Sequence, residues 1–189
     1  MQEVNRDLVR GVVKKIEVAL ANGAEILLFK ASTRSYSNLL REILRFFTGF
    51  ADGIYVSFNK PCKSLRRLLS SAGVNVDRLV FIDCVSRQYA YERGNECIYV
   101  SSPDPVHIQV ALRKASERLN SERKFVFFDS LSTISLYKSK ESMIKFLRQV
   151  TGKLRMEGFV VLLFTLEGEL DEATYAQVFL MSDEVIELV

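Results

Sequence analysis

A short polar segment, residues 30–37, has the residue types of a site that could bind an anion. It follows an apolar run at 26–29 and precedes residues 37–48, whose apolar spacing predicts an amphipathic helix. Backbone N–H groups and the dipole at the start of a helix attract negative charge, so Lys30 and Arg34 could hold an anion there. Simple solvation explains these two side chains equally well. The candidate side chains are Lys30, Arg34, Ser35, Tyr36 and Ser37.

A few carboxylates also follow apolar runs and could take part in chemistry. Asp129 ends the run at 124–128, where it could hold a metal-bound water opposite Ser37. A carboxylate that caps the following turn is the simpler interpretation, and we favour it. Glu167 and Glu169 follow a later apolar run and resemble a catalytic pair, although nothing in the sequence places a substrate between them.

The order of strand, loop and helix around residues 30–37 is the setting of a phosphate-binding P-loop, G-x-x-x-x-G-K-[ST]. Lys30 stands at the first glycine position and Ser35 at the second. Tyr36 stands at the lysine position, so only Ser37 matches. In a P-loop the glycines let N–H groups close around the phosphates, and the lysine neutralises them. This segment therefore lacks the residues of the usual phosphate chemistry.

The elements that must position these residues alternate along the chain. Unbroken apolar runs, each ended by polar residues, are typical of buried parallel strands, and the helices between them would cover both faces of the sheet. Strands are predicted near 26–29, 54–58, 78–83, 97–100, 124–129, 159–165 and 184–189. Helices are predicted over 4–21, 37–48, after Pro61, after Asp104-Pro105, over 143–154 and over 171–181. We expect one domain over 1–189, with the strand after 124 near the centre and the helix within 1–22 packed outside.

Composition narrows the function classes. The chain has 189 residues with a net charge of +3, so nothing global favours a nucleic-acid binder, and nucleic acid is not an expected partner. The longest apolar run, 159–164, is too short to span a bilayer, so no membrane is expected. Three cysteines without paired spacing favour free thiols in a reducing cytosol over a disulfide framework. A single histidine argues against a His-based metal site. We therefore expect a soluble cytoplasmic protein.

The net charge hides an asymmetry. Residues 30–70 hold eight basic and two acidic side chains, a balance of +6, whereas residues 166–189 hold seven acids and no base. Two such segments could pair between copies of the chain, or could neutralise each other within one copy. The basic segment alone would also support a weaker hypothesis, that the chain is a nucleic-acid-binding module. Salt-sensitive binding of DNA or RNA would test it.

Several segments together resemble the RecA-like P-loop ATPases, and among them the KaiC-like branch common in archaea. The resemblance runs in order through residues 20–189, and each piece alone is weakly specific. It is carried by 54–58 and 80–83 as the second and third strands, by Phe125–Ser132 as the strand with the magnesium-organising aspartate, by Gly158–Glu167 as the next strand, and by Ser182–Leu188 as the closing strand. It implies an α/β, three-layer RecA-like fold with a mainly parallel central sheet flanked by helices.

The departures from this family decide the predicted function. The family has a glutamate after the second strand that polarises the attacking water, and here Asn59-Lys60 stands in its place. We therefore predict a non-catalytic RecA/KaiC-like module, a pseudo-ATPase that acts in regulation or protein–protein assembly, with a protein partner and no expected cofactor. The alternative is an ATP-binding protein with a non-standard phosphate site formed by Lys30, Arg34, Ser37 and Asp129. RecA-like subunits commonly pack head to tail, but without nucleotide between them we expect a monomer or weak oligomer.

Overall fold

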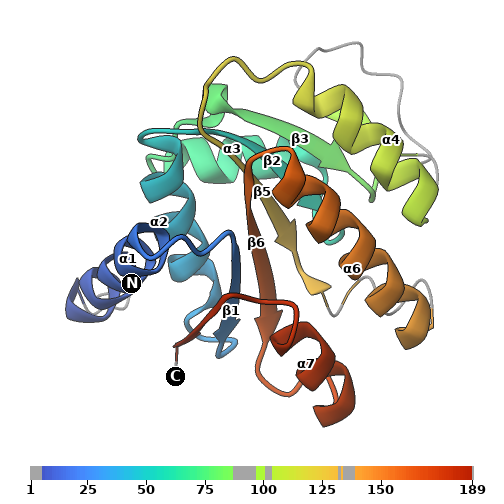
Figure 1. Ribbon diagram of the computed structural model, residues 1–189. Helices are drawn as coiled ribbons and strands as arrows, with labels where there is room; N and C mark the ends of the chain where they lie inside the picture. The colour runs from blue at the N-terminus through green and yellow to red at the C-terminus, as the bar shows by residue number, and fades with distance from the viewer. Residues whose placement is uncertain (1–5, 87–96, 101–103, 132, 134–138, 189) are drawn as a thin grey trace.

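A seven-stranded, wholly parallel β-sheet forms the centre of the computed structural model, which describes residues 6–86, 97–100, 104–131, 133 and 139–188 (Figure 1). The strand order is β4-β3-β2-β5-β6-β1-β7, so β5 lies between β2 and β6 in the middle of the sheet. The strands are β1 (Ile26–Ala31), β2 (Asp52–Ser57), β3 (Leu79–Asp83), β4 (Cys97–Tyr99), β5 (Lys124–Asp129), β6 (Phe159–Leu166) and β7 (Glu184–Leu188).

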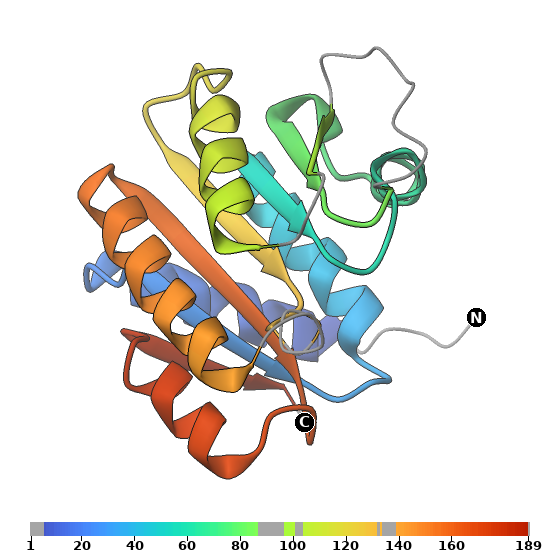
Figure 2. The ribbon, with the colours of Figure 1, turned by 90° about the vertical axis from the view of Figure 1, so that its right-hand side faces the viewer.

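Helices cover both faces of this sheet. Helices α1, α2 and α3 pack on one face, and α4, α6 and α7 pack on the other (Figure 1). Figure 2 looks onto the second face, where α4, α6 and α7 lie in front of the strands. The helices are α1 (Arg6–Ala21), α2 (Tyr36–Thr48), α3 (Cys62–Ser71), α4 (Pro105–Ser116), α6 (Lys140–Met156) and α7 (Glu172–Phe179), and a 3-10 turn, η1 (Val76–Arg78), precedes β3.

The central strand β5 illustrates how the apolar runs build two cores. Phe125 and Phe127 join the cluster under α1–α3, whereas Val126 and Phe128 join the cluster under α4, α6 and α7. Successive side chains of a strand point to opposite faces, so a strand covered on both faces must be apolar at every position. This is why the strands read as unbroken apolar runs and not as alternating patterns.

Close packing in the middle of the sheet requires a glycine at one position of β2. Gly53 pairs in register with Phe125 of β5. A Cβ atom placed on Gly53 would lie 2.2 Å from a ring carbon of Phe125, which no real side chain tolerates. The aromatic ring therefore occupies the space that a larger residue on β2 would need.

The structure confirms the predicted α/β fold: three layers around a parallel sheet, with β5 central and α1 outside against α2 and β7. Each predicted strand is present, and Asp104 caps α4 by accepting the amides of Val106 and His107 at 3.1 Å each. Several boundaries differ by a few residues: β1, for example, continues through Lys30 to Ala31, and β2 begins at Asp52. Lys30 is paired on both sides, with Thr165 of β6 and Glu187 of β7, so the ladder extends past the apolar run. Within the described residues, no helix combines the length and the apolar character needed to cross a membrane.

Candidate functional site

The candidate site lies where β1 and β5 end and α2 begins. In open α/β sheets, ligands bind beyond the carboxyl ends of the strands. The segment from Ala31 leads into α2, whose N-cap residue is Ser35, and Asp129 is the last residue of β5. Parallel strands place all their carboxyl ends on one edge, so the topology brings residues 31–37 and Asp129 to the same edge of the sheet.

The loop before α2 closes on itself. The amides of Ser35 and Tyr36 both donate to the carbonyl of Ser32 at 3.1 Å, and the hydroxyls of Ser32 and Ser35 lie 2.9 Å apart. No residue of this loop is a glycine, and none of the non-glycine residues that the structure describes has a positive φ. An anion-binding nest needs successive N–H groups in alternating right- and left-handed conformations. The loop therefore lacks the backbone geometry of a phosphate cradle.

Tyr36, which aligns in the sequence with the lysine of the P-loop pattern, reaches the strand-end acid. Its hydroxyl donates to Oδ1 of Asp129, and its ring meets Phe164 edge-on with the centroids 5.2 Å apart. Burial, followed by the neighbouring charge of Asp129, raises the pKa of the Tyr36 hydroxyl far above its usual value. The side chain thus acts as a neutral donor to the carboxyl group of Asp129.

Tyr55 of β2 is the second donor to the same carboxylate. Its hydroxyl donates to Oδ2 of Asp129, and the residue is fully buried. The ring lies between Phe81 and Phe127, with centroid distances of 5.6 and 5.2 Å. The sequence interpretation did not include Tyr55 among the site residues. The available signal was a tyrosine inside an apolar strand, because a buried hydroxyl needs a hydrogen-bond partner.

Asp129 is therefore buried, with a tyrosine on each oxygen. Its side chain is 1% exposed, and burial raises the pKa of the carboxyl above its usual value. The two tyrosine hydrogen bonds and the charge of Lys60 oppose this rise, and Glu169 adds to it. Neither the metal-water nor the turn-cap interpretation includes this arrangement of two tyrosines on one acid.

The other predicted site residues lie around this cluster in different ways. The Lys30 ammonium is 3.4 Å from Glu187 of β7 and 4.9 Å from the ring centre of Tyr175. Arg34 and Ser37 are exposed, one in the loop and one in the first turn of α2. The structure brings Tyr36 to Asp129 and uses Ser35 in the turn, whereas the contacts of Lys30 lead to β7 and α7. Across the described ranges, no group of three His, Cys, Asp or Glu side chains could hold a metal ion.

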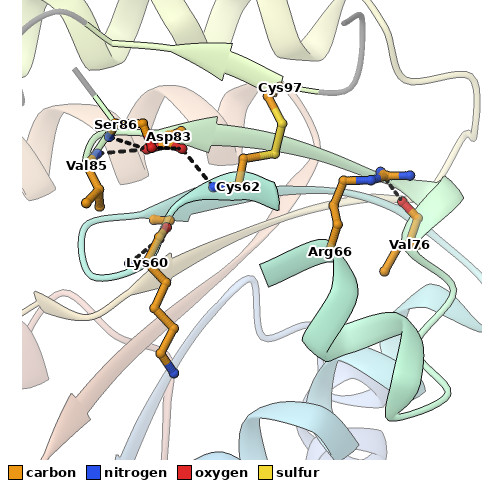
Figure 3. Close-up of a disulfide and its surroundings, with 9 residues drawn as sticks. Lys60, Cys62, Arg66, Val76, Asp83, Val85, Ser86 and Cys97 are labelled. Atoms are coloured by element: carbon orange, nitrogen blue, oxygen red, sulfur yellow. Dashed lines mark hydrogen bonds between the residues drawn. A yellow bond between two sulfur atoms is a disulfide. The ribbon is translucent and has the colours of Figure 1, made fainter. Parts of the chain in front are cut away.

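A second buried acid lies two strands away, at the end of β3. The carboxylate of Asp83 accepts the amides of Cys62, Val85 and Ser86 at 2.7 to 2.9 Å and the Ser86 hydroxyl at 2.8 Å (Figure 3). Ser57, which ends β2, pairs in register with both Asp83 and Asp129. The two acids therefore flank β2 at the same edge of the sheet.

The expectation of free thiols is wrong for two of the three cysteines. Cys62 and Cys97 form a disulfide across a sequence separation of 35 residues (Figure 3). Spacing alone gave no sign of this bond, because the parallel pairing of β3 with β4 brings Cys97 to the start of α3. Cys84 is a buried free thiol, and burial raises its pKa to about 12. Disulfides are rare in a reducing cytosol, so the cysteines no longer support the cytoplasmic location, which stays a prediction.

The acidic C-terminal segment finds cations within the same chain. Asp171 bonds to Lys140 and Asp183 bonds to Arg155, both from α6. Glu187 pairs with Lys30, the one of these contacts that joins the acidic segment to the basic segment 30–70. These exposed pairs are individually weak, but they reduce the charge that would drive association between copies.

Comparison with known proteins adds to this geometry. No protein-family model and no curated protein matches the sequence. Among solved structures, an uncharacterized protein from Pyrococcus horikoshii, in complex with an unknown peptide, superposes with a TM-score of 0.65 at 17% identity, covering 91% of this chain and 82% of that one. A KaiC-like protein from the same species superposes at 0.61 with 16% identity, covering 86% and 70%. The flagellar accessory protein FlaH from Methanocaldococcus jannaschii superposes at 0.56 with 13% identity, covering 86% and 70%.

The chain has the RecA-like fold. The resemblance to RecA-like and KaiC-like proteins is thereby confirmed for the fold. At these identities the likeness extends to the fold alone, so the activity of this RecA-like domain must be argued from its own residues.

Proposed function

We propose that this RecA-like domain does not hydrolyse ATP and acts instead through contacts with a protein partner, in regulation or assembly. The observation that carries the proposal is the hydrogen bond from Tyr36 to Asp129. It joins the position of the P-loop lysine to the position of the magnesium-organising aspartate. In an active ATPase the residues at these two positions would bind ATP and magnesium, whereas here their side chains bond to each other.

The residues present do not fit a nucleoside triphosphate. The loop before α2 has no glycine, and its amides at Ser35 and Tyr36 donate to Ser32. A phosphate bound there would need these N–H groups, together with a positive charge at the position of Tyr36. Binding a phosphate here would first require these hydrogen bonds to break, and the free energy of breaking them would weaken the affinity.

The residues do not fit magnesium either. Mg²⁺ is usually held by one or two carboxylates together with water and phosphate oxygens. Both oxygens of Asp129 accept tyrosine hydroxyls, and burial raises the pKa of this carboxyl, so its charged form is disfavoured. Asn59 and Lys60 stand at the position of the base, and neither can accept a proton from water as a carboxylate does.

The assembly part of the proposal has two supports. The RecA-like scaffold is present without the residues of ATP chemistry, and a fold can host functions other than the one it is best known for. One of the similar solved structures, the uncharacterized P. horikoshii protein, was crystallised in complex with an unknown peptide. A peptide or protein segment is accordingly the class of partner we propose for this chain.

Calorimetry with Mg-ATP and Mg-ADP tests the proposal on the 189-residue protein. We expect no binding tighter than about 100 μM, which corresponds to about −5.5 kcal/mol. Circular dichroism on the same samples verifies that the protein is folded. Tighter binding of either nucleotide would favour the nucleotide-binding alternative, and release of phosphate from ATP above the rate of a protein-free control would refute the non-catalytic assignment.

A second candidate function is nucleotide binding through a non-standard phosphate site. It is favoured by the exposure of Arg34 and Ser37 near the start of α2, a 13-residue helix whose N-terminus attracts anions. If calorimetry detects nucleotide, Arg34→Ala should then weaken binding at least about tenfold, since it removes a charged hydrogen bond. The matched control is Arg67→Ala, another exposed arginine of the basic segment, which should leave the affinity unchanged.

A further inference from the structure

A covalent bond joins two elements that the sheet alone holds weakly. Cys62 is the first residue of α3, and Cys97 is the first residue of β4 (Figure 3). Strand β4 has three residues and forms one edge of the sheet. Strands usually have five or six residues, and parallel pairing is weaker per residue than antiparallel pairing. A strand this short depends on additional attachment.

The noncovalent attachment of β4 comes from strand pairing and from core packing. It pairs with β3 at three register positions, and the amide of Val100 donates to the Asp83 carbonyl at 3.0 Å. Ile98 and the buried Val100 pack into the core that α4 covers. All three residues of β4 are nevertheless half-buried, whereas β3 is buried at four of its five positions. The disulfide adds a covalent attachment to this exposed edge of the sheet.

The two ends of the disulfide differ in access and in anchorage. Cys62 is 1% exposed, whereas Cys97 is half-buried. The amide of Cys62 donates to the Asp83 carboxylate at 2.7 Å, which fixes this end of α3 whether or not the sulfur is bonded. A thiol from solution would consequently reach Sγ of Cys97, and β4 is the element free to move once the bond opens.

We propose that Cys62–Cys97 is a site of reversible redox modification, and that its state decides whether β4 stays on the edge of the sheet. The reductant is a thiol such as glutathione. Its thiolate attacks Sγ of Cys97, the sulfur–sulfur bond breaks, and Cys62 leaves as a thiolate that takes up a proton. A second thiol then attacks the mixed disulfide and releases Cys97, which also takes up a proton. The protein gains two electrons and two protons, and the two thiols become a disulfide.

The experiment measures the redox state of the two cysteines and the mobility of β4 on the same 189-residue protein. A Cys84→Ser variant leaves only the two sulfurs in question. It is equilibrated in buffers of graded ratio of reduced to oxidised glutathione, quenched with an alkylating reagent and weighed by mass spectrometry. We expect both thiols to become alkylated together within the range of these buffers. We also expect amide exchange at 97–100 to accelerate at least about tenfold, while exchange in β1 is unchanged.

Several outcomes would overturn the proposal. A bond that stays closed in about a hundred-fold excess of reduced glutathione would be purely structural. Opening without faster exchange at 97–100 would mean that the bond does not hold β4. Two alkylated thiols in the fully oxidised buffer would mean that the disulfide does not form. The Cys62→Ser, Cys97→Ser double variant should show the fast exchange in every buffer, and reduction of the parent protein gives the same test if that variant does not fold.

Discussion

Two buried acids, Asp83 and Asp129, end the strands on either side of β2 and make an instructive pair. Each is 1% exposed, and each lies in register with Ser57. Asp83 accepts three backbone amides and one hydroxyl, whereas Asp129 accepts two tyrosine hydroxyls. Residue type, burial and strand position are the same, and only the donors differ.

The two kinds of donor respond differently when the carboxylate is replaced by a neutral group. A backbone N–H can only donate, so the site around Asp83 requires an acceptor on both oxygens. A hydroxyl can donate or accept, so the tyrosines around Asp129 can adapt to a neutral side chain. The backbone amides around Asp83 therefore require a carboxylate, which fixes the start of α3. The tyrosine hydroxyls around Asp129 tolerate its substitution by a neutral side chain. An identical substitution at the two positions measures this contrast.

The largest effect is expected for Asp83→Asn. The amide nitrogen of the new side chain would face a donor, whichever way it turns, and at least one buried N–H would lose its charged acceptor. Losing such a bond and leaving a buried donor unsatisfied costs about 3 kcal/mol of unfolding free energy. Urea unfolding measures it as a lower midpoint at an unchanged slope.

Asp129→Asn is the matched control for that experiment. It makes the same chemical change at the same depth on the other side of β2. Equal losses at the two positions would contradict the distinction between rigid and adaptable donors, and would mean that burial of the acid alone sets the cost.

Tyr55→Phe should have the next largest effect. It removes the hydroxyl from a fully buried ring and leaves Oδ2 of Asp129 without this donor. Because water has little access there, we expect a loss of about 2 kcal/mol, within the range for leaving a buried polar group unsatisfied. Thermal unfolding followed by circular dichroism is the measurement. An unchanged midpoint would mean that the Tyr55 hydroxyl does not contribute to the cluster.

The sequence predicted the fold well because the strands of a covered parallel sheet must be apolar throughout. Strands 124–129 and 159–165 were evident for that reason, and Asp104-Pro105 marked the start of α4 through its capping chemistry. The prediction also singled out Tyr36 and Asp129 as members of one site, Tyr36 from its place on a strand–loop–helix unit and Asp129 from its place at a strand end and from the family resemblance. It did not predict that they would bond to each other.

Contacts between distant segments were the part that could not be predicted. Tyr55 joins the cluster because β2 and β5 pair in a particular register, and Cys97 meets Cys62 because β4 adds to β3. Neither contact can be predicted from the residues next to it in the sequence, since each depends on the order of the strands in the sheet. A buried tyrosine indicates that its hydroxyl needs a hydrogen-bond partner, but not which residue supplies it.

Tyr36→Phe should have a smaller effect than Tyr55→Phe. The ring contact with Phe164 is kept, and Tyr36 is only half-buried, so water can replace its hydroxyl on Oδ1 of Asp129. We expect a loss of about 1 kcal/mol in the same thermal measurement. A loss larger than that of Tyr55→Phe would reverse the ranking by burial and would make Tyr36 the principal partner of the acid.

The smallest loss of unfolding free energy at neutral pH is expected for Asp129→Asn, at no more than about 1 kcal/mol, because both tyrosine hydroxyls can reorient toward the amide.

The dependence of this loss on pH is the sharper test. Burial raises the pKa of Asp129 in the folded protein, so the folded state binds this proton more tightly than the unfolded chain does. The resulting stability is fully present below the usual aspartate pKa and is lost as the pH rises through the raised value. Asparagine does not titrate, so the stability of the parent minus that of the variant should fall as the pH rises from roughly 4, and then level off. Urea unfolding of both proteins across this range measures the difference, in which the other titrating groups cancel. A difference that is flat or that grows with pH would mean that Asp129 is stabilised as a charged group, as an acid bracketed by fixed amides would be.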